Sequence, residues 1–263
     1  MYPNELFFGI TLYDLFVALG AAAALVLFRL LSDRLHLSAR KTNLALLGGA
    51  LGFVLGLGAA TLLQAFYNWM AGEDFAIVAN TGATFYGGLI GGTAVFLAVY
   101  LGLGARLLPA GEAKASVGTV SAMAACSIAV AHAIGRIGCL FAGCCHGIYT
   151  DSFAGVYMPA AGGTVLPTQL YEAIFLLFLG ALLCYRVLRG KTDGFFFYLT
   201  AYGFFRFFLE YLRGDYRGAS LVSFLTPSQL VALLMVAVGM SYYLLTEQKK
   251  SEKKQDSTEE GEA

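Results

Sequence analysis

Residues 135–147 read Gly-Arg-Ile-Gly-Cys-Leu-Phe-Ala-Gly-Cys-Cys-His-Gly and are flanked by strongly apolar sequence. The stretch puts a cation, three thiols and an imidazole where ionisable groups are costly unless they have a role. His132, Arg136 and Cys139 are spaced by four and then three residues, so they share one face if the preceding helix continues this far. The glycines further on favour a compact loop. We therefore expect a functional site at this junction of helix and loop.

Composition indicates the solvent in which the chain folds. Apolar residues make up 58% and charged residues 13%, and the mean hydropathy is +0.70. In a water-soluble domain about a quarter of the residues are charged. The chain is therefore predicted to be an integral membrane protein embedded in a lipid bilayer. Its charges are segregated along the sequence without forming a basic surface, so we expect no nucleic-acid partner.

Seven apolar stretches are long enough to cross a bilayer, which predicts an all-α bundle of about seven transmembrane helices in residues 1–246. Their approximate bounds are 7–31, 44–69, 83–108, 117–138, 168–188, 194–212 and 227–245. In the second stretch, Gly48, Gly52 and Gly56 form a small-residue ridge that suits close helix packing. Residues 247–263 are charged and free of aromatic side chains, and we expect them to form a disordered tail.

The lysines and arginines set the expected orientation, because cytoplasmic loops carry an excess of them. All but four of the 17 cationic residues fall on the side of the carboxyl-terminal tail. The four exceptions are Arg136, Arg206, Arg213 and Arg217. We therefore expect an amino terminus outside the cell and a cytoplasmic carboxyl terminus. The four exceptions oppose this tendency, so they need anionic partners.

A second polar face is expected in the sixth span. It consists of Tyr202, Arg206, Glu210 and Arg213, which are spaced by four, four and three residues. They share one side of a helix that is otherwise rich in phenylalanine. Arg206 and Glu210 could simply neutralise each other. A second embedded arginine, Arg136, shifts the interpretation toward an anion-binding site.

The start of the fifth span adds two polar side chains. A proline at the first helical turn is ordinary initiation chemistry. Gln169 and Glu172 follow it, three residues apart. The expected topology puts both level with Arg136 and Arg206, so we include them in the candidate site.

Four motifs occur in an order and at a spacing that resemble those of the prolipoprotein diacylglyceryl transferase family. They are Tyr-Gly-Gly-Leu at 86–89, Gly-Arg-Ile-Gly at 135–138, Thr-Gln-Leu-Tyr-Glu at 168–172 and Arg-Phe-x-x-Glu-Tyr-x-Arg at 206–213. The resemblance implies a multi-pass protein of the cytoplasmic membrane with an outside amino terminus. It also implies transfer of a diacylglyceryl group from phosphatidylglycerol to the lipobox cysteine of a prolipoprotein. The reaction would release glycerol phosphate at the outer face.

The resemblance and the residue chemistry together assign candidate roles. The catalytic candidates are His132, Arg136, Arg206 and Glu210. The candidates for substrate binding are Tyr86, Gly87, Gly88, Cys139, Cys144, Gly147, Gln169, Glu172 and Arg213. The two embedded guanidiniums would hold the lipid phosphate and stabilise charge on the departing oxygen. A base must take the proton of the acceptor thiol, and the candidates are His132, Glu172, Glu210 and His146. We favour His132, because it lies one helical turn before Arg136.

Three positions depart from the family pattern. The family motif usually has Asn and then, five residues later, Glu, where this chain has Cys139 and Cys144. Tyr86 stands where the family typically has histidine. The resemblance to the family therefore supports anion binding by this chain better than it supports proton transfer. The alternative function is a non-catalytic, anionic-lipid-binding or redox-responsive membrane protein on the same scaffold. We expect no cofactor in either case.

The thiols of Cys139, Cys144 and Cys145 have three interpretations. We favour a disulfide that braces the loop, because the outer compartment is oxidising. A metal site is less favoured, because the usual pair of separated cysteine clusters is missing. A nucleophilic thiol, activated by Arg136, is the third interpretation.

The expected orientation can be tested by labelling. A cysteine introduced by Ser152→Cys should react with a membrane-impermeant maleimide in intact cells, whereas Ser251→Cys should react only after permeabilisation. The mass of each labelled protein, compared with that of the unsubstituted chain, separates the new thiol from the native ones. Labelling of the Ser251→Cys protein in intact cells would overturn the orientation.

Overall fold

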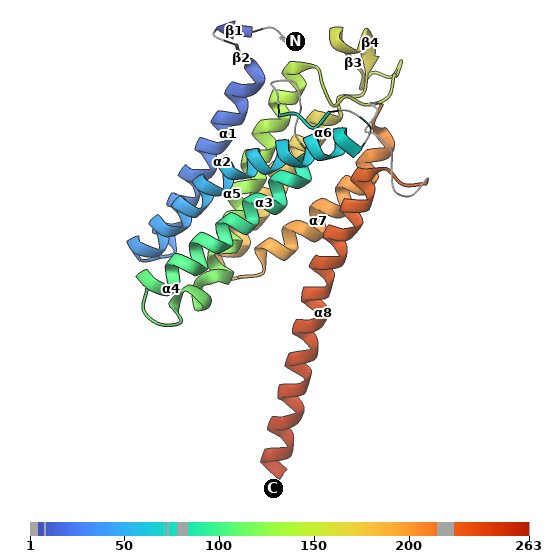
Figure 1. Ribbon diagram of the computed structural model, residues 1–263. Coiled ribbons are helices and arrows are strands. Elements are labelled where there is room, and N and C mark those ends of the chain that lie inside the picture. Colours follow the sequence, from blue (N-terminus) through green and yellow to red (C-terminus); the bar gives the residue numbers. More distant parts are fainter. Residues whose placement is uncertain are drawn as a thin grey trace.

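The computed structural model of the chain describes residues 5–7, 9–70, 72, 74–77, 84–214 and 224–262. Its helices are α1 (Leu12–Arg34), α2 (Ala39–Met70), α3 (Phe85–Leu97), the π-helix η1 (Ala98–Leu103), α4 (Gly104–Leu107), α5 (Glu112–Ala142), the 3₁₀ turn η2 (Pro159–Ala161), α6 (Thr168–Leu188), α7 (Gly194–Leu209), the 3₁₀ turn η3 (Glu210–Leu212) and α8 (Pro227–Glu262). The short strands are β1 (Glu5–Phe7), β2 (Ile10–Thr11), β3 (Val156–Met158) and β4 (Gly163–Val165). Figure 1 shows a helical bundle with its strands at one end.

The bundle has the character of a multi-pass membrane protein, as predicted. In the described chain, six helices are long and apolar enough to cross a membrane, and the third is α3, η1 and α4 in series. The expected sixth span is shorter than the others, because α7 has 16 residues and then tightens into η3. The strand β1 and the end of α8 lie at opposite ends of the bundle (Figure 1).

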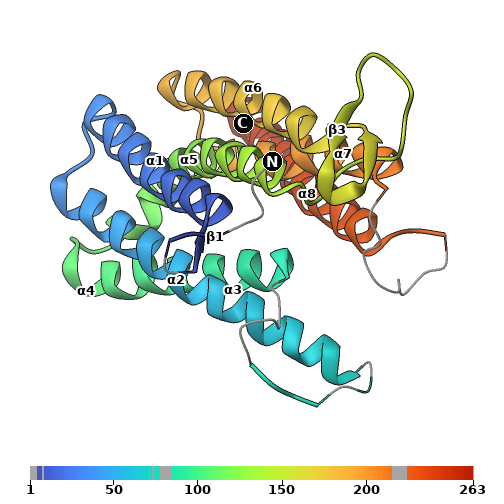
Figure 2. The same ribbon diagram turned by 90° about the horizontal axis from the view of Figure 1, so that it is seen from above.

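The helix α5 is the central element. It packs most extensively against α1 and α6, and Figure 2 shows it between them. Its fully buried residues are mostly small: Val120, Ala122, Met123, Ala125, Cys126, Ala129 and Ala133. Small side chains allow neighbouring backbones to approach closely, which drives helix association in lipid. A Cβ atom on Gly20 of α1 would lie 2.8 Å from the carbonyl oxygen of Ala131.

A glycine ridge joins α2 to α3, as the sequence predicted. A Cβ atom on Gly52 would lie 2.8 Å from the carbonyl oxygen of Gly92, and one on Gly56 would lie 3.0 Å from that of Gly88. Gly87 is as tightly placed, because a Cβ atom there would lie 2.6 Å from the carbonyl oxygen of Ala59. These distances require backbone-to-backbone contact between the two helices.

The helix α5 ends later than the sequence predicted, at Ala142 instead of near residue 138. Gly143 adopts a left-handed conformation with φ of 75° and stops the helix there. The N–H groups of Gly143 and Cys144 donate to the carbonyls of Leu140 and Cys139, at 3.2 Å each. This Schellman arrangement turns the chain sharply, so the loop begins beside the last turn of the helix.

The loop between α5 and α6 contains a small antiparallel hairpin. Strand β3 pairs with β4 in the register Val156 to Val165 and Tyr157 to Thr164. The hairpin lies at the end of the bundle opposite the carboxyl terminus (Figure 1).

At the other end of the bundle, α8 continues as a helix to Glu262, where composition predicted a disordered tail from residue 247. The division between residues 246 and 247 stays a prediction.

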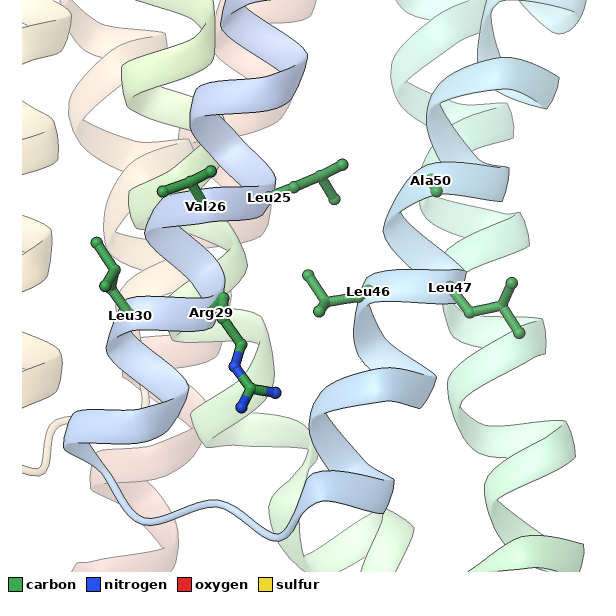
Figure 3. A pocket seen from close by; sticks show the side chains of 7 residues that line it. All are labelled: Leu25, Val26, Arg29, Leu30, Leu46, Leu47 and Ala50. Atoms are coloured by element: carbon green, nitrogen blue, oxygen red, sulfur yellow. The ribbon is translucent and has the colours of Figure 1, made fainter.

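An apolar groove lies between α1 and α2, with a volume of about 500 Å³. It is lined by Leu25, Val26, Arg29, Leu30, Leu46, Leu47 and Ala50. Figure 3 shows Leu25 and Leu46 extending into the space between the two helices. Its only ionic side chain, Arg29, is paired with Asp33 at 3.2 Å. None of the predicted site residues lines this groove.

The glycine ridge predicts an asymmetry between two glycines of α2. Gly52→Ala should lower the stability of the protein in detergent by roughly 1–3 kcal/mol, because its new methyl group meets the backbone of α3. Gly49→Ala is the matched control, since no atom lies within 4 Å of its Cβ position. Thermal unfolding of both variants measures the difference. Equal melting temperatures would contradict the assigned packing.

Candidate functional site

The carboxylate of Glu172, in the first turns of α6, is the centre of a buried polar cluster. Its side chain is fully buried. The Oε1 atom accepts a hydrogen bond of 2.6 Å from the hydroxyl of Tyr202 and lies 3.0 Å from Nη2 of Arg136. The Nε2 atom of His132 is 3.6 Å away. One carboxylate oxygen therefore joins α5, α6 and α7.

The helical spacing of the sequence explains how these groups meet. His132 and Arg136 lie one turn apart on α5, as expected, and both face Glu172. The Nδ1 atom of His132 lies 3.3 Å from the hydroxyl of Tyr198, which stacks on Tyr202. Tyr198 was missed by the sequence analysis. Its signal was available, because it extends the four-residue spacing of the polar face on α7 by one turn.

A second ion pair lies where α7 becomes η3. Nη2 of Arg206 is 2.6 Å from Oε2 of Glu210, so these two side chains form the ion pair that the sequence analysis had left as one of two alternatives. The same Nη2 donates to Oγ of Ser228 at 3.3 Å, and Thr226 donates to Glu210 at 3.0 Å. The start of α8 thus closes over the pair. Thr226 and Ser228 are not among the site residues that the sequence analysis proposed.

Both arginines keep unused hydrogen-bonding capacity. Among the described residues, Nε of Arg136 and Nη1 of Arg206 are buried without a hydrogen-bond partner. Oε2 of Glu172 is also without one. Arg206 acts electrostatically on Glu172 as well, so the two ion pairs belong to one electrostatic cluster. Buried donors without acceptors are costly, which favours an anion as a further ligand.

The loop after α5 is held by backbone contacts, several of them to predicted site residues. Nε2 of Gln169 donates to the carbonyl of Cys144 at 2.5 Å, and Thr168 donates to that of Cys145 at 2.9 Å. Gly147 pairs with Arg213 in an isolated antiparallel bridge. A Cβ atom on Gly147 would lie 2.6 Å from the carbonyl oxygen of Leu212, so no larger residue fits. Gln169, Gly147 and Arg213 therefore position this loop.

The thiols of Cys139, Cys144 and Cys145 are free, so the favoured disulfide is not formed. Their Sγ atoms all lie within 4.8 Å of one another. Hydrogen bonds from the other two thiols lower the pKa of Cys145. The guanidiniums of Arg136 and Arg213 lower this pKa further, whereas burial opposes the shift. The structure therefore contradicts the predicted disulfide and places three free thiols side by side.

The remaining predicted residues lie apart from the polar cluster or are only partly described. Gly87 and Gly88 are on α3, where their backbones pack against α2. Tyr86 begins the same helix, and its side chain lies outside the described part of the structure. Nδ1 of His146 bonds to the carbonyl of Gly147 at 3.0 Å. Arg217 lies outside the described residues.

Comparison with known proteins agrees with the arrangement of motifs. The chain matches the family model described as prolipoprotein diacylglyceryl transferase over residues 4–245. It is 30% identical over 243 residues to the phosphatidylglycerol–prolipoprotein diacylglyceryl transferase of Clostridium tetani, covering 89% of this chain and 92% of that protein. It is 34% identical over 171 residues to transferase 2 of that name from Clostridium perfringens, covering 62% of each. The phosphatidylglycerol–prolipoprotein diacylglyceryl transferase of Geobacter sulfurreducens is 27% identical over 257 residues, which cover 90% of this chain and 91% of that protein.

The central ion pair predicts a large difference between two carboxylates. Glu172→Gln should destabilise the protein by roughly 3–5 kcal/mol, because it leaves the buried guanidinium of Arg136 without its counter-ion. Asp33→Asn is the matched control. It removes the carboxylate of the exposed Arg29–Asp33 pair and should cost less than about 1 kcal/mol. Unfolding in detergent measures both, and equal losses would show that Glu172 does not hold the helices together.

Proposed function

Because the chain belongs to the prolipoprotein diacylglyceryl transferase family, we propose that it transfers the diacylglyceryl group of phosphatidylglycerol to the lipobox cysteine of a prolipoprotein. The observation that supports this most is the pair of buried guanidiniums at one end of the bundle. Arg136 and Arg206 are each fixed by a carboxylate, and each keeps a buried donor that has no hydrogen-bond partner in the described part of the chain. A lipid phosphate supplies the acceptor oxygens that such donors need.

The proposed reaction exchanges one bond for another at the glyceryl carbon. The sulfur of the acceptor cysteine attacks the diacylglyceryl carbon that carries the phosphate ester, forming the C–S bond. The C–O bond to phosphate breaks, and glycerol phosphate leaves with the bonding electron pair. Arg136 and Arg206 stabilise the negative charge that grows on the departing oxygen. Because their carboxylate partners fix both guanidiniums in advance, little reorganisation is needed at the transition state.

The proton of the acceptor thiol needs a base, and His132 remains our candidate. Its Nε2 atom lies 3.6 Å from Oε1 of Glu172, and its Nδ1 atom lies 3.3 Å from the hydroxyl of Tyr198. The acceptor thiol would take the place of the Tyr198 hydroxyl at Nδ1 and pass its proton to that nitrogen, while the carboxylate at Nε2 would stabilise the imidazolium that forms. Glu172 itself is a poorer base, because Arg136 and Tyr202 both donate to it.

We propose that this end of the bundle faces outward. The cationic residues gather at the opposite end, including Arg29, Arg106, Arg186 and the lysines of the tail. The phosphate site would then open to the outer leaflet and to an exported acceptor. Arg136 lies six residues before the end of α5 and Arg206 three before the end of α7, so both would lie near the outward ends of their helices.

The replacement of two family positions by Cys139 and Cys144 favours a second candidate. A protein that has lost part of its proton-transfer machinery could keep the phosphate site and bind anionic lipid without transfer. The two candidates share the guanidiniums and differ in whether a thioether product forms. Assays of product and of lipid binding on the same protein therefore separate them.

The transferase proposal predicts a strict requirement for guanidinium geometry. Arg136→Lys and Arg206→Lys should each lower the rate of transfer by about a hundredfold or more, because an ammonium keeps the charge but loses the planar pair of donors. Charge is retained, so the partner carboxylates stay neutralised and the fold is kept. Mass spectrometry of a lipobox peptide incubated with phosphatidylglycerol and purified protein measures the thioether product.

Arg186→Lys is the control for this assay. Arg186 also pairs with a carboxylate, Asp193 at 2.7 Å, but at the far end of α6. Its replacement should leave the rate within about twofold. A wild-type protein that binds phosphatidylglycerol yet transfers nothing to any thiol peptide would refute the enzyme proposal and leave the lipid-binding one.

A further inference from the structure

The three thiols at the end of α5 form a cluster to which the proposed transfer reaction assigns no bond-making or proton-transfer step. The Sγ atoms of Cys139, Cys144 and Cys145 lie within 4.8 Å of one another. Thiolate sulfurs bind Zn²⁺ at about 2.3 Å, so sulfurs that share one ion lie roughly 4 Å apart. The observed separation is therefore close to that of a thiolate metal site and needs only a small contraction.

The backbone of the thiol cluster is fixed by contacts that involve no sulfur–sulfur bond. The Schellman turn brings the N–H of Cys144 onto the carbonyl of Cys139. Gln169 and Thr168 of α6 then hold the carbonyls of Cys144 and Cys145. These contacts set the convergence of the side chains before any ligand arrives.

Cys145 carries backbone strain within this arrangement. Its φ is 63°, a left-handed conformation that non-glycine residues rarely adopt. Such strain persists where the surrounding structure enforces it, and it clusters at ligand sites. The sequence offers glycines at 143 and 147, yet the strained position is occupied by a thiol. The conformation thus aims a metal-ligating side chain at the other two.

The charges around the cluster suit a bound ion better than a disulfide. Three thiolates bound to a divalent cation carry one net negative charge, and Arg136 precedes Cys139 by one helical turn on α5. A disulfide would neutralise two thiols and leave the third without a function. The sequence disfavoured a metal site here because the chain lacks two separated cysteine clusters. The turn at Gly143 makes such clusters unnecessary. It folds the Cys-x-x-x-x-Cys-Cys segment back on the helix end.

We propose that Cys139, Cys144 and Cys145 bind a thiophilic metal ion, with Zn²⁺ as the biological ion. Three protein ligands leave the fourth position of a tetrahedral ion open. Cys144 is exposed, so that position is reachable from outside the bundle. The ion would tie the last turn of α5 to the loop that follows Arg136. This proposal does not depend on transferase activity.

Metal binding is tested on the full-length protein, purified in detergent with a phosphine reductant. After treatment with a chelator, titration with Cd²⁺ should give a sulfur-to-metal charge-transfer band that saturates at one ion per chain. Cys139→Ser, Cys144→Ser and Cys145→Ser should each weaken binding by roughly tenfold or more. Cys184→Ser, which changes a thiol of α6 outside the cluster, should leave the titration unchanged.

A second measurement needs no variant and so does not depend on the folding of one. Zn²⁺ should protect the three cluster thiols of the wild-type protein from alkylation, as counted by peptide mass spectrometry. The proposal is overturned if the reduced thiols alkylate equally fast with and without Zn²⁺, or if the native protein contains a disulfide between two of them. Equal losses of Cd²⁺ binding in Cys184→Ser and the cluster variants would also overturn it.

Discussion

The ion pair between Arg136 and Glu172 is the interaction on which the functional end of the bundle depends. It joins α5 to α6 in an interior where an unpaired charge of either sign costs several kcal/mol. Tyr202 adds α7 to the same carboxylate oxygen. Apolar packing of small residues brings the helices together, while this carboxylate fixes how they are rotated relative to one another.

The Arg136–Glu172 and Arg206–Glu210 ion pairs at the functional end of the bundle differ in their surroundings from the Arg186–Asp193 pair at the other end. Arg136 and Arg206 both act electrostatically on Glu172, so their ion pairs belong to one cluster. A buried donor without a hydrogen-bond partner does not distinguish the two ends, because in the described part of the chain Arg136, Arg206 and Arg186 each have one. At the far end, Arg186 binds Asp193 through both carboxylate oxygens, and its guanidinium lies 4.4 Å from the ring centre of Phe197. Arg186 is therefore bound by one carboxylate and packed against one aromatic ring, an arrangement that serves the stability of the fold. At the functional end, Arg136 and His132 lie beside the carboxylate of Glu172 and Arg206 acts on the same carboxylate, so cationic groups and a titratable imidazole are gathered in one place.

The parts of the fold and site that depend on local periodicity could be predicted from the sequence. The spans, the glycine ridge of α2 and the Arg206–Glu210 pair each follow from spacing along one helix. The Arg136–Glu172 pair could not be predicted, because it requires the mutual rotation of α5 and α6, which sequence spacing does not encode. The thiol cluster was misjudged for a related reason. Its geometry depends on a turn at Gly143 that continues α5 past Cys139 and folds the loop back.

The central claim is that the guanidiniums of Arg136 and Arg206 bind one phosphate while Glu172 holds Arg136 in place. A high-resolution structure of the protein in a lipid nanodisc containing phosphatidylglycerol tests it most directly. The account predicts one lipid phosphate within hydrogen-bonding distance of both guanidiniums, with Arg136 still paired to Glu172. A phosphate bound elsewhere in the bundle, with both guanidiniums contacting only protein, would contradict it.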